Sequence, residues 1–144
     1  MIPESVLCYE TAHQVCLPGA TLHPGGLTLT RHAVELANLP SGARILDLGC
    51  GGGESARFLA LAGYDVVGVD RSLLLLSTSQ AGSENRVCAD AKALPFAPNS
   101  FDAILAECTL SLFKPLGPIL DSLFPLIKEN GYLLISDLCT RAPN

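Results

Sequence analysis

Two carboxylates and a run of glycines in the first half of the sequence have the spacing of a ligand-binding turn. The stretch ILDLGCGGG, residues 45–53, places Asp47 near the end of an apolar run, and four glycines follow within six residues. The next apolar run, VVGVD, ends on Asp70. Glycine lets the backbone approach a ligand closely, and the free amides at the start of a helix bind polar groups. This pattern indicates a site for a nucleoside-bearing cofactor.

Two cofactor classes are open at this turn. Gly51, Gly53 and Ala56 fit the degenerate dinucleotide fingerprint, with Asp70 as a ligand of the ribose. The alternative is S-adenosylmethionine, which carries an amino acid and a sulfonium where a dinucleotide carries a pyrophosphate. Asp47 repels a pyrophosphate but attracts an ammonium group, so the sequence favours the methyl donor over NAD.

Strands and helices that must position these residues alternate along the chain. Apolar, β-branched runs predict strands at residues 43–48, 65–69, 86–88, 101–106 and 131–137. Periodicity and end signals predict helices from residue 27 to Pro40 and at residues 54–62, 72–80 and 119–129. Ser72 is the expected N-cap of the third helix, Pro125 is expected to kink the last one, and Asn130-Gly131 to end it. The apolar positions of the first helix are Leu29, Ala33, Leu36 and Ala37.

This alternation predicts the fold class. The order is typical of an α/β protein with a three-layer, doubly wound, mostly parallel sheet. Such sheets bind ligands beyond the carboxyl ends of their strands, where Asp47, Asp70, Asp90 and Glu107 lie in the sequence. With 144 residues, we expect one domain at residues 24–144, preceded by an irregular N-terminal arm at residues 1–23.

Four motifs in order resemble the class I S-adenosylmethionine-dependent methyltransferases, of the methyltransferase-11 type. ILDLGCGGG looks like the glycine-rich signature of that family, and VVGVDRS like its second-strand acid. CADAKALPFAPNSFDAIL is similar to its third and fourth strands, and NGYLLISDL to its fifth. The likeness covers nearly everything from Pro24 to Asp137 and implies transfer of a methyl group to a small-molecule acceptor, with S-adenosylhomocysteine as product.

The resemblance also implies roles for individual residues. Asp47, Gly49 and Gly51 surround the methionine part, and Asp70 accepts from both ribose hydroxyls. Asp90 and Ala91 lie against the adenine. Glu107 falls where the family places cofactor and substrate contacts. The remaining cofactor positions implied by the motifs are Cys50, Gly53 and Arg71.

One departure from the family concerns the end of the chain. The family sheet has seven strands, the last two forming an antiparallel hairpin, whereas this sequence stops at CTRAPN, just beyond the fifth. We expect a truncated domain that lacks the hairpin, or a second copy of the chain that covers the open edge as a homo-oligomer.

Each assignment has a plainer alternative. Asp70 could be simply a helix-capping acid, Asp90 could be a loop acid, and Glu107 could be a solvated acid at a strand end. Candidate catalytic residues are Glu107, Cys108 and His23. His32 is expected on the surface. The chain could also bind the cofactor without transferring its methyl group.

The cysteines suggest one further alternative for the acceptor. The segment AECTLSLF places Cys108 after a predicted strand, in a setting similar to that of the family's arsenite methyltransferases. Cys8, Cys16 and Cys108 could together hold a thiophilic substrate, although buried small side chains explain Cys108 more simply. No spacing of cysteine and histidine predicts a metal site.

Charge and hydropathy argue against several partner classes. The net charge is −5 and lysine and arginine do not cluster, which argues against nucleic acid and anionic membranes. No apolar run approaches the roughly 20 residues of a membrane span. The N-terminus lacks a basic segment followed by an apolar one, so we expect a cytoplasmic protein.

Overall fold

The computed structural model describes residue 11, residues 21–78 and residues 85–139. Its described part contains one five-stranded sheet in the order β3-β2-β1-β4-β5, and every neighbouring pair is parallel. The strands are β1 (Arg44–Leu48), β2 (Asp65–Asp70), β3 (Arg86–Cys88), β4 (Phe101–Glu107) and β5 (Ile127–Ser136). The helices are α2 (Gly26–Ala37), α3 (Glu54–Leu61), α4 (Leu73–Ser77) and α5 (Gly117–Leu123), with 3-10 turns at η1 (Leu110–Leu112) and η2 (Phe124–Leu126).

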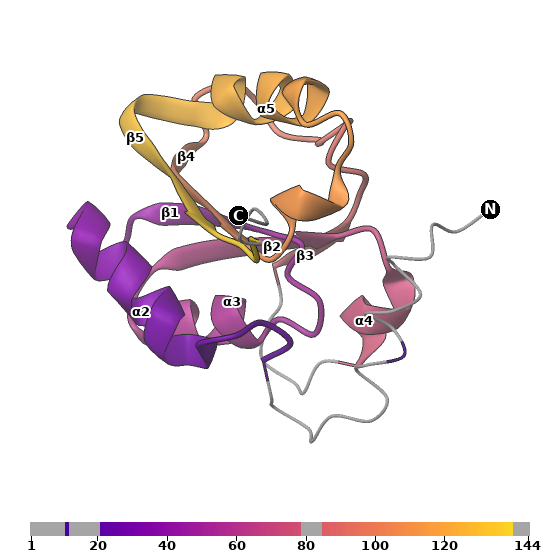
Figure 1. Ribbon diagram of the computed structural model, residues 1–144. Helices are drawn as coiled ribbons and strands as arrows, with labels where there is room; N and C mark the ends of the chain where they lie inside the picture. The colour runs from indigo at the N-terminus through magenta and orange to yellow at the C-terminus, as the bar shows by residue number, and fades with distance from the viewer. Residues whose placement is uncertain (1–10, 12–20, 79–84, 140–144) are drawn as a thin grey trace, which may run out of the picture.

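Helices cover both faces of the sheet, which confirms the predicted three-layer α/β fold (Figure 1). Successive side chains of a strand point to opposite faces, so Ile45 and Leu46 of β1 enter different cores. Ile45 packs on the side of α2 and α3, and Leu46 on the side of α5. Strands buried on both faces explain the continuous apolar runs of the sequence.

The sheet order reverses between β1 and β4. The chain leaves β1 through α3 to β2, whereas β4 lies on the opposite side of β1. The register pairs Leu48 with Ala106, so the ends of the two strands, and Glu107 just after Ala106, lie side by side. A switch point of this kind leaves a crevice at the carboxyl ends of the strands.

The prediction of a helix at residues 119–129 is wrong in its second half. Helix α5 ends at Leu123, and Pro125 lies in the 3-10 turn that follows, because it cannot donate the next helical hydrogen bond. β5 already begins at Ile127, and its pairing with β4 is shifted between Phe101 and Ala103. Asn130, with φ of 61°, therefore belongs to a bulge in a strand and does not end a helix.

The other elements follow the predictions with small shifts. Helix α2 buries Thr30, Val34 and Ala37, so its core face lies one residue beyond the predicted stripe, and Leu36 is 73% exposed. Ser72 caps α4 as predicted, its side chain accepting the amide hydrogen of Leu75 at 3.2 Å. The helix ends earlier than expected, with Thr78 as its C-cap.

Some sequence expectations fall outside the described residues. They include most of the N-terminal arm at residues 1–23, Cys8, Cys16, and residues 140–144. None of the helices that the structure describes has the length and apolar character needed to cross a bilayer.

Candidate functional site

A pocket lies at the carboxyl ends of β1, β2 and β4, at the switch point of the sheet. It brings together residues that the sequence places far apart. Gly53 does not line the pocket, but all the other predicted cofactor and catalytic residues do. These are His23, Asp47, Gly49, Cys50, Gly51, Asp70, Arg71, Asp90, Ala91, Glu107 and Cys108.

The glycine turn after β1 contains three residues with positive φ, Gly49, Gly51 and Gly53. Gly49 has φ of 76°, and a Cβ at this position would collide with the side chain of Thr109. Gly51 has φ of 53°, but the space beside it is open, with no atom within 4 Å of a would-be Cβ. The turn therefore packs against Thr109, just beyond β4, at Gly49 and leaves room at Gly51. Gly53, the N-cap of α3, ends the turn.

Asp70 at the end of β2 is held rigidly against this turn. Its Oδ2 accepts the amide hydrogen of Gly51 at 2.9 Å, and its Oδ1 accepts that of Ser72 at 2.8 Å. Each carboxylate oxygen has a second lone-pair direction, so the group can still accept two further hydrogen bonds. A fixed carboxylate of this kind suits a vicinal diol.

Asp47 is buried in the floor of the pocket, with a residue exposure of 3%. Burial raises the pKa of Asp47 to about 7, with the negative charges of Glu107 and Asp70 adding to the effect and the amide of Ala56 opposing it. Its Oδ2 has no hydrogen-bond partner among the described residues. A buried carboxylate in this condition requires a cationic or proton-donating partner.

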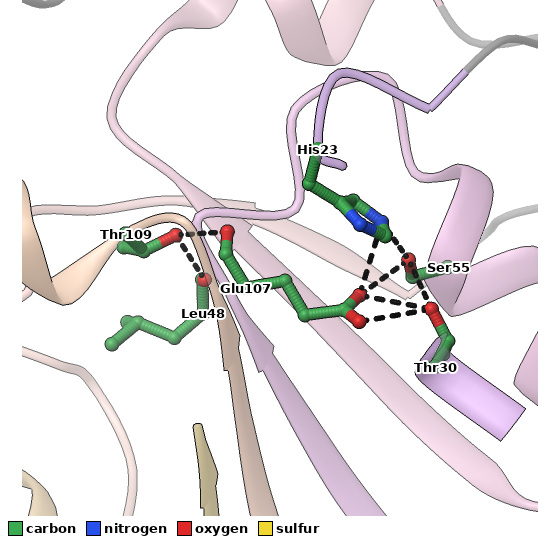
Figure 2. A network of polar contacts seen from close by, with 6 residues as sticks. All are labelled: His23, Thr30, Leu48, Ser55, Glu107 and Thr109. Carbon is green, nitrogen blue, oxygen red and sulfur yellow. Dashed lines mark hydrogen bonds and ion pairs between the residues drawn. The ribbon is translucent and has the colours of Figure 1, made fainter. Parts of the chain in front are cut away.

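Glu107 is the centre of a buried polar network (Figure 2). Its carboxylate accepts from Thr30 Oγ1 at 3.0 and 3.1 Å and from Ser55 Oγ at 2.8 Å. His23 Nε2 lies 3.2 Å from Glu107 Oε2 and 3.3 Å from Ser55 Oγ. The alternative of a solvated strand-end acid is therefore wrong, because the Glu107 side chain is only 4% exposed.

Sequence reasoning missed three hydroxyl residues that organise this network. Thr30 lies on the core face of α2 and Ser55 on that of α3. Thr109 donates to the carbonyl oxygens of Leu48 at 3.1 Å and Glu107 at 3.0 Å, and so links the ends of β1 and β4. The available signal was the spacing of Thr30 and Val34, which puts a hydroxyl in an apolar stripe.

The remaining predicted residues lie around the pocket. Asp90 is exposed, and its Oδ1 accepts the amide hydrogen of Lys92 at 2.9 Å, as a loop acid does. Ala91 beside it is buried, and Arg71 is exposed. The Cys50 side chain packs over Gly68 of β2, so Cys50 presents mainly backbone to the turn.

Cys108 follows β4 with a positive φ of 51° and is buried. Burial, reinforced by the charges of Asp137 and Glu107, raises the pKa of its thiol. A protonated thiol is a poor ligand for soft centres, since the thiolate is the binding form. His32 is exposed, as expected.

A family model described as "Methyltransferase domain" matches residues 46–135, which run from β1 to β5 and include the whole glycine turn. The chain belongs to the class I S-adenosylmethionine-dependent methyltransferases.

Relatives of this methyltransferase domain act on different acceptor atoms. Phosphoethanolamine N-methyltransferase of Triticum aestivum is 32% identical over 146 residues, covering 96% of this chain and 28% of that protein. Malonyl-acyl-carrier-protein O-methyltransferase of Pseudescherichia vulneris is 33% identical over 68% of this chain and 40% of that protein. The crystal structure of the cyclase SpnF matches with a TM-score of 0.64 and 26% identity, over 71% of this chain and 41% of that one. The chain thus spans less than half the length of each of these proteins.

The methyltransferase pocket fits the charge of the family's methyl donor. S-Adenosylmethionine supplies an electrophilic methyl group on a sulfonium, and it also carries an ammonium group. Among the described residues that line the pocket, Arg71 is the one arginine or lysine, whereas five residues are acidic. The acidic residues are Asp47, Glu54, Asp70, Asp90 and Glu107. Such a lining attracts a cationic ligand and repels a pyrophosphate.

Proposed function

We propose that this chain binds S-adenosylmethionine in the pocket at the switch point and transfers its methyl group to a small-molecule acceptor. The observation that carries the proposal is Asp47, a fully buried carboxylate whose Oδ2 has no partner among the described residues. An ammonium group satisfies both needs of this side chain, because it donates a hydrogen bond and neutralises the charge. NAD offers no cation near a phosphate-bearing turn, so it fits the same position poorly.

The remaining cofactor residues are assigned by their chemistry. Asp70 accepts from the ribose hydroxyls, since the backbone already orients its carboxylate. Gly51 leaves open space for the methionine part, and Gly49 lets the turn pack closely against Thr109 beside it. Asp90 and the adjacent Ala91 lie at the pocket wall, where they suit the adenine.

Methyl transfer asks little covalent chemistry of the protein. It is an in-line displacement, and holding two reactants in line supplies up to roughly 7–11 kcal/mol of the barrier. The chain contributes by orienting the donor through Asp47 and Asp70 and by enclosing the reacting atoms. The relatives suggest an amine and a carboxylate as acceptors to assay first, namely phosphoethanolamine and a malonyl thioester.

Isothermal titration tests the proposal directly. The chain is titrated with S-adenosylmethionine, S-adenosylhomocysteine and NAD, together with the variants Asp70→Asn and Asp65→Asn. Asp65 lies at the other end of β2 and away from the pocket, so it is a matched control. We expect binding of the first two ligands, weakened at least about tenfold in Asp70→Asn, which loses charged hydrogen bonds of about 1.5–3 kcal/mol, and unchanged in Asp65→Asn. Binding of NAD alone contradicts the proposal.

Two other functions can be separated from this one by turnover. A module that only binds the cofactor gives tight complexes and no methylated product with any acceptor. A thiophilic acceptor is disfavoured by the raised pKa of Cys108, and Cys108→Ser is expected to leave binding of arsenite unchanged.

A further inference from the structure

The hydrogen-bond pattern around His23 determines which ring nitrogen carries the proton. Ser55 Oγ donates its single proton to Glu107, and Glu107 accepts from both Ser55 and Thr30 (Figure 2). The two neighbours of His23 Nε2, Glu107 Oε2 and Ser55 Oγ, are therefore both acceptors at this point. Nε2 must carry a proton to bond to either of them.

The other nitrogen of the ring is left with a lone pair. In a neutral imidazole with the proton on Nε2, Nδ1 is an acceptor. His23 Nδ1 is shielded from solvent and has no hydrogen-bond partner among the described residues, although His23 lines the pocket. A lone pair in this position gains a partner only from a bound molecule or from one water that links it to the pocket.

The charge around the pocket selects the kind of molecule that supplies this partner. Asp47, Asp70 and Glu107 approach it from three strands, and the charges of Glu107 and Asp70 both help to raise the pKa of Asp47. A cation is favoured here over an anion. Among methyl acceptors, an alkyl amine arrives as a cation, and it must lose a proton before its nitrogen can attack.

We propose that the methyl acceptor is an amine and that His23, positioned by Glu107, removes its proton. This inference rests on the proposed function. The ammonium gives one proton to His23 Nδ1, directly or through one water, and keeps the electron pair on nitrogen. That pair forms the new carbon–nitrogen bond while the carbon–sulfur bond of the sulfonium breaks, leaving its electrons on sulfur as a thioether. The imidazolium charge formed on His23 faces the carboxylate of Glu107.

His23 is a catalytic residue in this scheme, and Glu107 is a positioning residue. Glu107 fixes the ring through Nε2–H, and Thr30 and Ser55 fix Glu107 from α2 and α3. The arrangement explains why the carboxylate of Glu107, at the switch point, accepts hydrogen bonds from side chains of the protein.

Nitrogen NMR of the imidazole rings tests the proposal without knowledge of the natural acceptor. The chain has three histidines, so His13→Gln, His23→Gln and His32→Gln assign all the signals. We expect the neutral ring of His23 to carry its proton on Nε2, and the Nδ1–H form to rise in Glu107→Gln. A proton on Nδ1 of the neutral wild-type ring overturns the proposal.

A matched pair of cations then tests the class of acceptor. The S-adenosylhomocysteine complex is titrated with methylammonium and with tetramethylammonium, which have the same charge but differ in N–H groups. We expect methylammonium alone to shift the Nδ1 signal of His23. Equal responses to the two cations, or no response to either, overturn the amine assignment. The same titration is carried out with phenol, and a shift of the Nδ1 signal by phenol but not by methylammonium identifies a hydroxyl acceptor and also overturns the amine assignment.

The cofactor measurements keep the two proposals separable. His23→Gln is expected to bind S-adenosylhomocysteine within about threefold of the wild type, because His23 is assigned to the acceptor. Failure of the wild type to bind this ligand overturns the proposed function, while the tautomer of His23 is read in the free chain. With an amine that is methylated, loss of the base is expected to lower kcat at least about 100-fold, and an unchanged kcat overturns the role of His23.

Discussion

Replacing Asp47 with asparagine is expected to stabilise the free chain while it weakens cofactor binding. Burial and the neighbouring charges of Glu107 and Asp70 raise the pKa of Asp47 from 3.8 to about 7. The folded chain therefore holds a proton that the unfolded chain has released between these pH values. Unfolding is favoured as pH rises through this range, so the contribution of Asp47 to stability falls between pH 4 and 7.

The size of this effect follows from the shift in pKa. Each unit corresponds to about 1.4 kcal/mol, so ionised Asp47 costs the fold about 4 kcal/mol above pH 7. At pH 5 the cost is only about 2 kcal/mol, because the folded side chain is still protonated. Asp47→Asn keeps the shape of the side chain and removes the charge. Its advantage over the wild type is expected to grow by about 2–3 kcal/mol from pH 5 to pH 8.

Urea denaturation of both proteins at pH 5 and pH 8 measures this difference. Titrating groups that lie far from Asp47 affect the wild type and the variant alike, so the comparison reports on Asp47 and its interaction with Glu107 and Asp70. Titration with S-adenosylmethionine is expected to show at least about a tenfold loss of affinity in Asp47→Asn, since a charge-assisted hydrogen bond of about 1.5–3 kcal/mol disappears. A variant that is less stable than the wild type at pH 8, or a difference that does not change with pH, refutes the reasoning.

Two further predictions concern the stability of the fold. Gly49→Ala is expected to lower the free energy of unfolding, measured by urea denaturation, by about 2–5 kcal/mol, because it combines a positive φ with a collision against Thr109. Gly42→Ala is the control: its φ is 77° but the space beside it is open, so the expected loss is only about 1–2 kcal/mol. Equal losses in the two variants contradict the packing argument. The hydrogen bond from Lys128 lowers the pKa of Asp102, so this carboxylate stabilises the fold above the ordinary value of 3.8 and loses that effect as pH falls below it. Asp102→Asn is expected to reduce the free energy of unfolding at pH 7 by under about 1 kcal/mol, and this reduction shrinks as pH falls through the lowered pKa of Asp102. A reduction that stays the same down to the lowest pH at which the chain is folded contradicts the assignment.

The sequence predicts the sheet and its acidic edge well, for a physical reason. Strands covered on both faces are short continuous apolar runs, and a polar residue that ends such a run marks the point where the strand leaves the core. Asp47, Asp70 and Glu107 all end or nearly end such runs, and parallel pairing brings these ends to one edge of the sheet. Local pattern and global topology agree here.

The errors lie where local signals compete with tertiary contacts. Asn130-Gly131 resembles the end of a helix, but Gly131 packs against Ile127 and the carbonyl oxygen of Asp102, where a Cβ has no room. This contact, between residues 29 positions apart, cannot be seen in a periodicity. The sequence does not reveal the role of Thr30 for a related reason. That role is a hydrogen bond to Glu107, which lies 77 residues away in the chain.

The polar groups that remain unpaired indicate where a ligand acts. Three buried side-chain atoms of the described residues have no hydrogen-bond partner: His23 Nδ1, Asp47 Oδ2 and Ser136 Oγ. An unpaired buried polar group costs about 1–3 kcal/mol, and folds tolerate such costs mainly at functional sites. Two of these three atoms belong to residues of the same pocket, beside the carboxylates of Asp70 and Glu107, which hydrogen bonds already hold in place. Asp47 Oδ2 requires a cation, and His23 Nδ1 requires a proton donor. Because these requirements differ, the pocket is suited to two different molecules, a cationic donor and an acceptor that must give up a proton.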